Sequence, residues 1–426
     1  MPIKIFENIK DFIDNYYFDR LKQIEVSGSV SEIINDVRMN GDKALLRYTM
    51  KFDGIKRKSV KADKDDFDEE NKVSKEELDL FHQAYENIKH FHHQELKNIS
   101  SWELKSSGIL MGQRLVPVER AGLYVPGGTA SYPSSVLMNV VPAMVAGVKE
   151  IVVVSPPDTR TGRLNKYVAA ILDMLEIKEV YVVGGAHAIA ALAFGTESIR
   201  PVDKITGPGN VYVAEAKRQV FGYVGIDSIA GPSEVVVMAD DSANPEYIAI
   251  DMLSQAEHDP LSKAICVTID NENAERICKS IDKFLQEIER KEIASRSITE
   301  NGAIVKVKSL EEAIEIVNAI APEHLELHLK DADSILHRIK NAGAVFIGDE
   351  TPEPIGDYWA GTNHVLPTGR SARFSSGLSV RDYLKWINYL HCDRSRLAAD
   401  GEKIIKLAEL EGLTAHAKAI KVRLMK

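Results

Sequence analysis

The middle of the chain alternates short β-branched runs with stretches at helical spacing, and this alternation constrains the fold more than any other feature. The runs are EIVVVSPP, EVYVVGG, SEVVVMAD and KAICVTID, and the stretches between them include LNKYVAAILDMLEI and NPEYIAIDMLSQAEH. Continuous apolar strands bounded by glycine and proline are typical of a parallel sheet that helices cover on both faces. The pattern therefore predicts an α/β fold.

The α/β pattern occurs in two blocks, which predicts two domains of this kind. The first block spans residues 120–229 and the second spans residues 230–375. Before them, residues 1–119 are predicted to be mainly helical, with a break at Gly41, and after them residues 376–426 are predicted to form a helical tail. A chain of 426 residues also exceeds what one hydrophobic core usually holds.

Charge and cysteine content indicate the class of partner and the compartment. The net charge is −10 and no long lysine or arginine run is present, whereas nucleic-acid binding relies on clustered cations. The three cysteines form no CxxC pair, which argues against a disulfide framework or a thiolate zinc site and favours a reducing cytoplasm. The N-terminus does not read as a signal peptide, and the longest apolar stretch, residues 136–148, contains Asn139 and Pro142. We expect a cytoplasmic protein that binds a small molecule, and neither nucleic acid nor a membrane.

Several glycine-rich turns adjoin the predicted strands. They lie in YVPGGTASYPSS, VGGAHAIA, ITGPGNVYVAEAKR and AGPSE, and none is a complete dinucleotide or Walker motif. Taken singly, each is more readily explained as a tight turn than as a phosphate cradle. In GPGN, however, Gly207 and Gly209 precede a predicted helix whose N–H groups could hold a pyrophosphate or a ribose edge, and Asn210 could donate and accept hydrogen bonds.

Three segments together indicate a metal site built from nitrogen and oxygen ligands. Gln255 and His258 in LSQAEHDP are spaced i and i+3, near the end of a helix that an Asn-Pro pair should begin. Asp357 lies between glycines in a predicted loop, GDYWAGTNH, and His416 lies in EGLTAH near the C-terminus. Such a ligand set suits Zn²⁺ and could also bind Mn²⁺ or Co²⁺. The alternative is that Gln255 and His258 are surface or capping residues.

A further pair of residues, in APEHLELHL, supplies two candidate bases. The carboxyl group of Glu323 and the imidazole of His324 have ordinary pKa values of about 4 and about 6.5, which suits a reaction with two distinct proton transfers. The alternative is that both are polar residues of the turn that follows the EEAIEIVNAIA helix. His364 and His391 are interpreted as structural.

The ordered series of motifs resembles the L-histidinol dehydrogenase family. The resemblance implies a zinc-dependent enzyme that oxidises L-histidinol to L-histidine through an enzyme-held aldehyde, with two NAD⁺, in the last steps of histidine biosynthesis. It also implies two incomplete Rossmann-like domains of aldehyde-dehydrogenase-like type, with smaller terminal pieces, and a homodimer in which EGLTAH reaches the active site of the other subunit. The matching segments are NGDKALLRYTMKFD, ERAGLYVPGGTASYPSSVLMN, GGAHAIAALAFGTESI, VDKITGPGNVYVAEAKR, AGPSEVVVMAD, LSQAEHDP, APEHLE, GDYWAGTNHVLPTG, ARFSSGLSV and EGLTAH.

The same resemblance implies roles for individual residues. His324 would act as general base in both oxidations, and Glu323 would activate the water that hydrates the aldehyde. The metal would mainly orient the substrate. The implied zinc ligands, which also contact the substrate, are Gln255, His258, Asp357 and His416. The other implied substrate contacts are Ser233, His324 and Glu411.

Contacts to NAD are implied at Tyr124, His187 and Asn210. The family often has glutamine where this chain has His187. A protonated histidine would favour phosphate, so we expect weak NAD binding that depends on pH near neutrality.

Two alternative functions stay open. One is a paralogous zinc- and NAD-dependent dehydrogenase of another small polar alcohol, such as a sulfonated diol, although Glu411, placed to meet a cationic amine, argues against an anionic substrate. The other is a non-catalytic metal- or nucleotide-binding protein descended from the enzyme. Such a protein should have lost at least one ligand or base, and all six of these residues are present.

Overall fold

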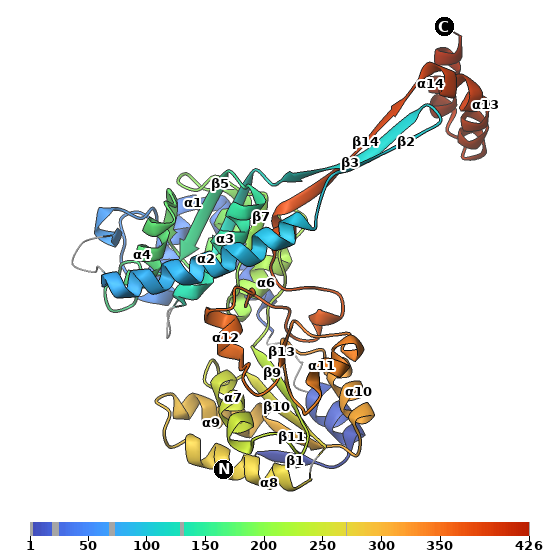
Figure 1. Cartoon of the computed structure of the whole chain (residues 1–426). Helices are drawn as coiled ribbons and strands as arrows, with labels where there is room; N and C mark the ends of the chain where they lie inside the picture. The colour runs from blue at the N-terminus through green and yellow to red at the C-terminus, as the bar shows by residue number, and fades with distance from the viewer. Residues whose placement is uncertain (1–2, 19–24, 68–72, 128–131, 270, 426) are drawn as a thin grey trace.

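The structure is a computed structural model that describes residues 3–18, 25–67, 73–127, 132–269 and 271–425. Two parallel sheets, each with helices on both faces, form the body of the molecule, and a long arm extends from it (Figure 1). The α/β fold predicted from the alternating pattern is therefore confirmed. Among the described residues, no helix combines the length and the apolar character needed to cross a bilayer.

The first sheet has five parallel strands in the order β6-β5-β4-β7-β8. Counted along the chain from β4, this order is 3-2-1-4-5, which is the order of a doubly wound nucleotide-binding sheet without its sixth strand. The strands are β4 (Arg120–Tyr124), β5 (Glu150–Ser155), β6 (Glu179–Val182), β7 (Lys204–Thr206) and β8 (Gly225–Ile226).

Helices cover both faces of the first sheet. Alternate side chains of its strands point to opposite faces, so they pack in two separate apolar cores. Val153 of β5 packs in the core beneath one helical layer, whereas Val152 and Val154 pack beneath the other. Gly41 kinks the longest helix with a φ of 50°, at the break that the sequence predicted. One layer consists of α2 (Lys75–Lys97), α3 (Pro133–Ala146) and α4 (Lys166–Met174), and the other of α1 (Ser27–Asp53), α5 (Gly185–Phe194) and α6 (Val211–Val220).

The second sheet has six parallel strands in the order β1-β11-β10-β9-β12-β13. Strands β9 to β13 repeat the order 3-2-1-4-5, and β1 from the start of the chain adds to the free edge of β11, with Lys4 opposite Ala303. The strands are β1 (Lys4–Phe6), β9 (Glu234–Ala239), β10 (Lys263–Thr268), β11 (Ala303–Lys306), β12 (His324–His328) and β13 (Ala344–Ile347).

Helical layers also cover both faces of the second sheet, with a separate apolar core on each side. One layer consists of α7 (Pro245–Ala256), α8 (Asn271–Phe284) and α9 (Lys291–Asn301). The other consists of the π-helix η1 (Asp11–Tyr17), α10 (Leu310–Ile320) and α11 (Ala332–Ile335), and the short helix α12 (Glu353–Tyr358) follows β13. Single 3₁₀ turns lie at η3 (Lys64–Phe67), η5 (Leu336–Arg338), η6 (Ser371–Arg373) and η7 (Val380–Tyr383).

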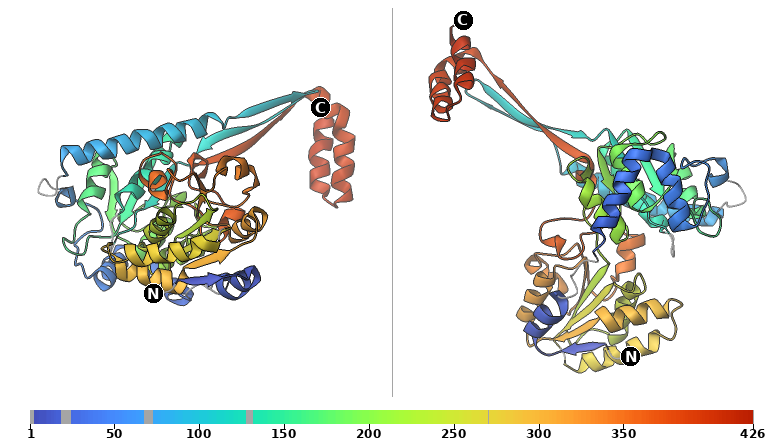
Figure 2. Two further views of the ribbon diagram at one scale, coloured as in Figure 1. Left: turned by 60° about the horizontal axis from the view of Figure 1, so that its bottom comes forward. Right: turned by 180° about the vertical axis from the view of Figure 1, so that it is seen from behind.

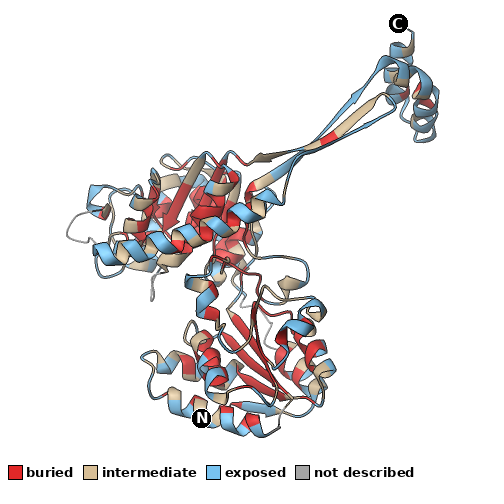
Figure 3. Ribbon diagram, in the orientation of Figure 1, coloured by how far each residue is buried: buried red, intermediate tan, exposed pale blue. Residues whose placement is uncertain are grey.

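The arm is a three-stranded antiparallel ribbon in the order β14-β3-β2, with two helices at its far end. It stands clear of the body in all the views of Figures 1 and 2, and most of its surface is exposed (Figure 3). Strand β14 was not predicted, because the sequence was expected to become helical after residue 376. The elements are β2 (Trp102–Ser106), β3 (Ile109–Pro117), β14 (Leu384–Cys392), α13 (Arg394–Leu410) and α14 (Thr414–Leu424).

Candidate active site

A cavity of about 310 Å³ lies where the carboxyl edge of the first sheet faces the amino edge of the second. Tyr124 ends β4 and Asn210 follows β7 on the first side, and Ser233 precedes β9 on the second. Ligands of such sheets bind outside the carboxyl ends of the strands, between the first and fourth strands. Eight of the residues singled out from the sequence line this one cavity: Tyr124, Asn210, Ser233, Gln255, His258, Glu323, His324 and Asp357.

Helix α7 and the turn that follows it bring Gln255 and His258 to the cavity. Its N-terminus forms as the sequence predicted, because the Asn244 side chain accepts a hydrogen bond from the N–H of Glu246 at 2.9 Å and Pro245 is the first helical residue. Gln255 lies in the last turn and is fully buried, yet among the described residues neither its Oε1 nor its Nε2 has a hydrogen-bond partner. A buried amide left unpaired is costly, so this side chain is suited to a ligand that enters the cavity.

Helix α12 supplies the acidic side of the cavity. Asp357 lies on this helix and not in a loop as the sequence suggested, and its Oδ1 is 3.8 Å from Nε2 of His324. Glu353, one helical turn earlier, places its Oε1 at 3.8 Å from the same nitrogen. Burial raises the pKa of Asp357, and burial together with the charge of Asp357 raises that of Glu353 well above its usual value. A cation beside these carboxyl groups would favour their ionised forms.

Strand β12 begins at His324, so both candidate bases lie at the amino edge of the second sheet. Nδ1 of His324 is 3.2 Å from the backbone oxygen of Glu234, which suits an Nδ1–H donor and leaves Nε2 as the basic nitrogen facing Glu353 and Asp357. Oε2 of Glu323 accepts a hydrogen bond of 2.8 Å from the N–H of Glu234. Burial raises the pKa of Glu323 well above its usual value and lowers that of His324 to about 4, so His324 is a neutral imidazole at pH 7.

The backbone of Glu234 therefore holds both bases, and its own side chain is fixed in turn. Its carboxylate pairs with Nζ of Lys263 at 2.7 Å and accepts a hydrogen bond from the N–H of Gly369 at 3.2 Å. Both members of this ion pair are buried. The two candidate bases are consequently held by the backbone of a central strand of the second sheet.

The cavity contains the donors that a divalent cation needs. His324, Glu353 and Asp357 each offer a ligand atom within 4.8 Å of the others, and Gln255 and His258 line the same cavity. Among the described residues, Nε2 of His324 and Oε2 of Glu353 are buried without a hydrogen-bond partner. Nitrogen and oxygen donors of this kind fit the zinc ion that the sequence resemblance implied.

Glu411 and His416 do not line this cavity. Glu411 lies at the end of α13 and His416 on α14, both exposed, and these two helices stand at the far end of the arm (Figures 1 and 2). Within one chain, the structure thus brings Gln255, His258 and Asp357 together without His416.

The residues assigned to NAD separate into two groups. Tyr124 and Asn210 line the cavity, whereas His187 lies inside α5, with its ring centroid 5.6 Å from that of Tyr48 and no hydrogen-bond partner among the described residues. Burial lowers the pKa of His187 to about 3, so the histidine stays neutral near pH 7. The pH dependence of NAD binding that we expected from its protonation therefore does not follow, and its contact with NAD stays a prediction.

The glycine-rich turns have structural roles of their own. Gly207 of GPGN has a φ of 114°, and a Cβ there would lie 2.1 Å from the backbone oxygen of Tyr124, so the turn requires glycine. The side-chain oxygen of Asn210 caps α6 by accepting hydrogen bonds from the N–H groups of Tyr212 and Val213. Residues 128–131 of the turn at 124–135 lie outside the described residues.

Two cavity residues were missed by the sequence reasoning. Glu353 was not singled out, because its spacing of four residues from Asp357 has meaning only on a helix, and α12 is too short for the sequence to mark. His364 was interpreted as structural, but it lines the cavity, and burial lowers its pKa to about 4. His391 lies on β14 in the arm.

The chain is similar to known proteins over nearly its whole length. Residues 19–424 match the family model described as histidinol dehydrogenase. Histidinol dehydrogenase of Bacillus cereus is 50% identical over 399 residues, which cover 93% of this chain and 92% of that protein. The Clostridium acetobutylicum enzyme of the same name is 46% identical over 414 residues, or 96% of each chain. A crystal structure of histidinol dehydrogenase from Elizabethkingia anophelis is 35% identical, with a TM-score of 0.90, and the match covers 99% of this chain and 97% of that one.

Proposed function

This chain belongs to the histidinol dehydrogenase family, and from that premise we infer that it is an oxidoreductase that converts L-histidinol to L-histidine in histidine biosynthesis. The reaction removes four electrons in two oxidations: the primary alcohol becomes an aldehyde, the aldehyde adds water, and the resulting diol becomes the carboxylic acid, which then loses a proton to give the carboxylate. Each oxidation releases one hydride and one proton. A protein base is therefore needed at both oxidations and at the hydration between them.

The observation that supports the proposed mechanism most directly is that the side chains of Glu323 and His324 both contact the backbone of Glu234. His324 would take the hydroxyl proton at Nε2 in the first oxidation and a diol proton at the same atom in the second. Glu323, held by the N–H of Glu234 at 2.8 Å, would take a proton from the water that adds to the aldehyde. The carboxylate of Glu353, 3.8 Å from Nε2, would stabilise the imidazolium form of His324.

Zinc and NAD⁺ are the proposed cofactors, and when bound the metal would provide a fixed point of attachment for the substrate while NAD⁺ would accept the hydride. We propose Gln255, His258 and Asp357 as metal ligands, and Ser233 as a substrate contact. The buried side-chain amide of Gln255, which has no hydrogen-bond partner among the described residues, supports the metal assignment. Tyr124, Asn210 and His187 are proposed to contact NAD, and the first two line the cavity on the side of the first sheet.

The paralogous enzyme for a sulfonated diol is not favoured. The family match and the named relatives support histidinol. The cavity is also lined by the carboxyl groups of Glu323, Glu353 and Asp357, which would repel a sulfonate and attract the cationic amine of histidinol.

We further propose a homodimer in which each arm completes the cavity of the other subunit. The arm exposes large apolar side chains, among them Leu390 at 70%, Leu407 at 64% and Leu410 at 72%, which is unusual for a surface that faces only water. The fourth proposed ligand, His416, and the substrate contact Glu411 are both carried there. A two-fold symmetric exchange would supply both to each cavity.

Subunit complementation tests the shared site. His258→Asn and His416→Asn variants should each be inactive, because each lacks one proposed ligand in every cavity. After unfolding and joint refolding, mixed dimers would contain one cavity with both histidines intact, so about a quarter of the wild-type activity should return for random pairing. If His416 served its own chain, mixing would restore no activity.

The reaction itself is tested by counting NADH formed by the zinc-loaded protein for each L-histidinol consumed. Two NADH per molecule, with L-histidine as the product, would support the four-electron reaction. A folded, zinc-loaded protein that does not turn over histidinol would refute the assignment. A cytoplasmic location is proposed as well, since the exposed thiol of Cys392 suits a reducing compartment.

A further inference from the structure

A second group of buried charged side chains lies beside the cavity, on the same strand and the same helix. In a β-strand, every second side chain lies on the same face of the sheet. His324, Glu326 and His328 of β12 therefore form one row on one face. On α7, Asp251 precedes Gln255 by one helical turn and lies on the same side of the helix. Strand β12 rises about 3.3 Å per residue, so His328 lies about 13 Å along the strand from His324.

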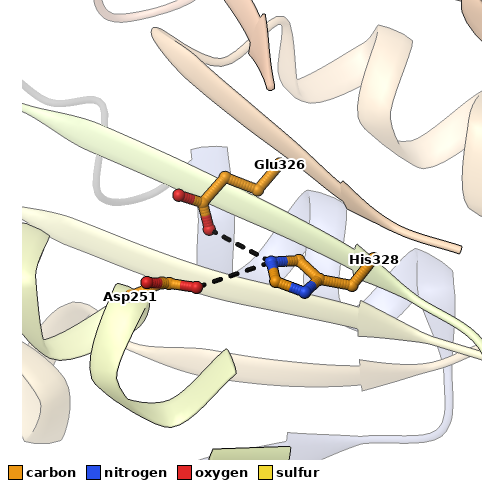
Figure 4. A group of neighbouring side chains, drawn as sticks. All are labelled: Asp251, Glu326 and His328. Carbon is orange, nitrogen blue, oxygen red and sulfur yellow. Dashed lines mark ion pairs between the residues drawn. The ribbon is translucent and has the colours of Figure 1, made fainter. Parts of the chain in front are cut away.

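Three carboxylates face His328: Asp251 from α7, Glu326 from β12 itself, and Asp349 from the loop that follows β13. Its Nε2 lies 3.4 Å from Oδ2 of Asp251 and 3.6 Å from Oε2 of Glu326, and its Nδ1 lies 3.0 Å from Oδ1 of Asp349 (Figure 4 shows the first two). Asp251, Glu326 and His328 are each at most 7% exposed. Burial alone would lower the pKa of His328, but the carboxylates of Asp251 and Glu326 raise it to about 10, so the ring is a cation at pH 7.

The same cluster also holds α12, the helix that carries Glu353 and Asp357. Oε1 of Glu326 accepts a hydrogen bond of 2.8 Å from the N–H of Glu353, in the first turn of α12. The residue before the helix is Pro352, whose side chain cannot cap it. Glu326 therefore replaces the missing cap from β12, the strand that pairs with β13, while Asp349 joins the loop before α12 to His328.

We propose that Asp251, Glu326 and His328 are positioning residues that fix α12 against α7 and so set the distance between the Glu353 and Asp357 side and the Gln255 side of the cavity. Groups outside the first ligand shell commonly tune a site by orienting its ligands. The expected effect of these residues on metal and substrate binding rests on the function proposed above. The attachment of α12 to β12 rests only on the contacts of Glu326 and Asp349.

Glu326→Gln is the variant that tests the attachment. In the wild type, one oxygen of Glu326 accepts the N–H of Glu353 and the other faces the protonated ring of His328. Glutamine has only one side-chain oxygen, so its NH₂ group must face one of these two donors. We expect amide hydrogen exchange in residues 353–358 to accelerate by about tenfold or more through local opening of α12, with exchange in β10 unchanged. We also expect Zn²⁺ affinity, measured against a chelator, to fall by about 10 to 100-fold.

Asp66→Asn is the matched control, since Asp66 is a buried carboxylate that pairs with Arg57 at 2.7 Å and does not line the cavity. It should lower the unfolding midpoint without changing exchange in α12 or Zn²⁺ affinity. If Glu326→Gln does not fold, Asp251→Asn removes one carboxylate from the cluster and leaves the cap of α12 in place, so a smaller change in the same two readouts is expected.

Two results would overturn the proposal. One is a Glu326→Gln protein that behaves like the control, with unchanged α12 exchange and Zn²⁺ affinity, which would make the cluster merely stabilising. The other is a second equivalent of Zn²⁺ in the wild type that disappears in Glu326→Gln, which would make the cluster a metal site. A wild type that binds no Zn²⁺ and oxidises no histidinol would refute the proposed function, while the exchange of α12 would still test its attachment.

Discussion

Replacing Glu323 with glutamine should separate the two oxidations. The carboxyl oxygen that accepts the N–H of Glu234 at 2.8 Å has a counterpart in the amide, so the side chain should keep its place. What is lost is the proposed base for hydration. General bases contribute about 10² to 10⁴ in rate, so the aldehyde step should slow by that factor, equivalent to about 3 to 5 kcal/mol of activation free energy. Alcohol oxidation, which needs no water, should change little.

The assay supplies histidinol and histidinaldehyde separately and counts NADH. With histidinol, the yield should fall from two NADH per molecule towards one as the aldehyde accumulates. Glu353→Gln is the matched control, because this neighbouring buried carboxyl group lies 3.8 Å from the imidazole of His324, which is proposed to act in both oxidations. It should slow both steps. An equal loss of both steps in Glu323→Gln would refute the role of Glu323 in hydration.

The same substitution has a predictable effect on stability. Burial raises the pKa of Glu323 in the folded state, so its contribution to stability is present below the pKa of an unfolded glutamate and is lost as pH rises through the folded value. Glutamine cannot ionise and keeps the neutral form at every pH. After metal removal, Glu323→Gln should therefore unfold at pH 8 at a temperature no lower than that of the wild type.

Three other predictions follow from the described contacts. His258→Asn should reduce bound zinc to near zero by elemental analysis and abolish turnover, and full activity without metal would contradict the proposed site. His187→Gln should leave the pH dependence of the KM for NAD⁺ between pH 6 and 8 unchanged, because burial lowers the pKa of His187 to about 3, and a difference within that range would contradict the burial argument. The raised pKa of His328, about 10, means that its contribution to stability is present below pH 6.5 and is lost as pH rises towards 10. The unfolding free energy should consequently fall more between pH 7 and 10 in the wild type than in His328→Gln, and parallel curves would show that the imidazolium is not stabilising.

The central strands could be predicted from the sequence because burial on both faces gives them an unbroken apolar pattern. EIVVVS forms β5 and SEVVVMA contains β9, and the helices between them follow the apolar periodicity. The strands of the arm lack that signal. Trp386, Ile387 and Tyr389 in β14 are all exposed, so no buried face imposes an alternation on the strand. Strand β1 has only three residues, too few for a periodicity to be read.

The candidate site could be predicted in part, because apolar patterns mark some of the elements that carry its residues. Gln255 and His324 each lie near the end of a helix that the pattern marks, whereas only the resemblance of the motifs grouped Asp357 with them. Glu353 was missed because its role depends on α12, whose six residues are too few for a helical pattern. The buried state of His187 depends on packing against α1, which no local pattern reports.

The pairing of β1 with β11 has a consequence for how the chain must be synthesised and handled. Residues 4–6 are synthesised about 300 residues before β11, the strand with which they pair. They can therefore pair only after the whole first sheet and most of the second have been synthesised. Until it arrives, β11 has an open edge that can pair with another nascent chain. Trimming the first few residues, or fusing a rigid tag to them, should therefore promote aggregation even though these residues lie far in sequence from any group that touches the substrate.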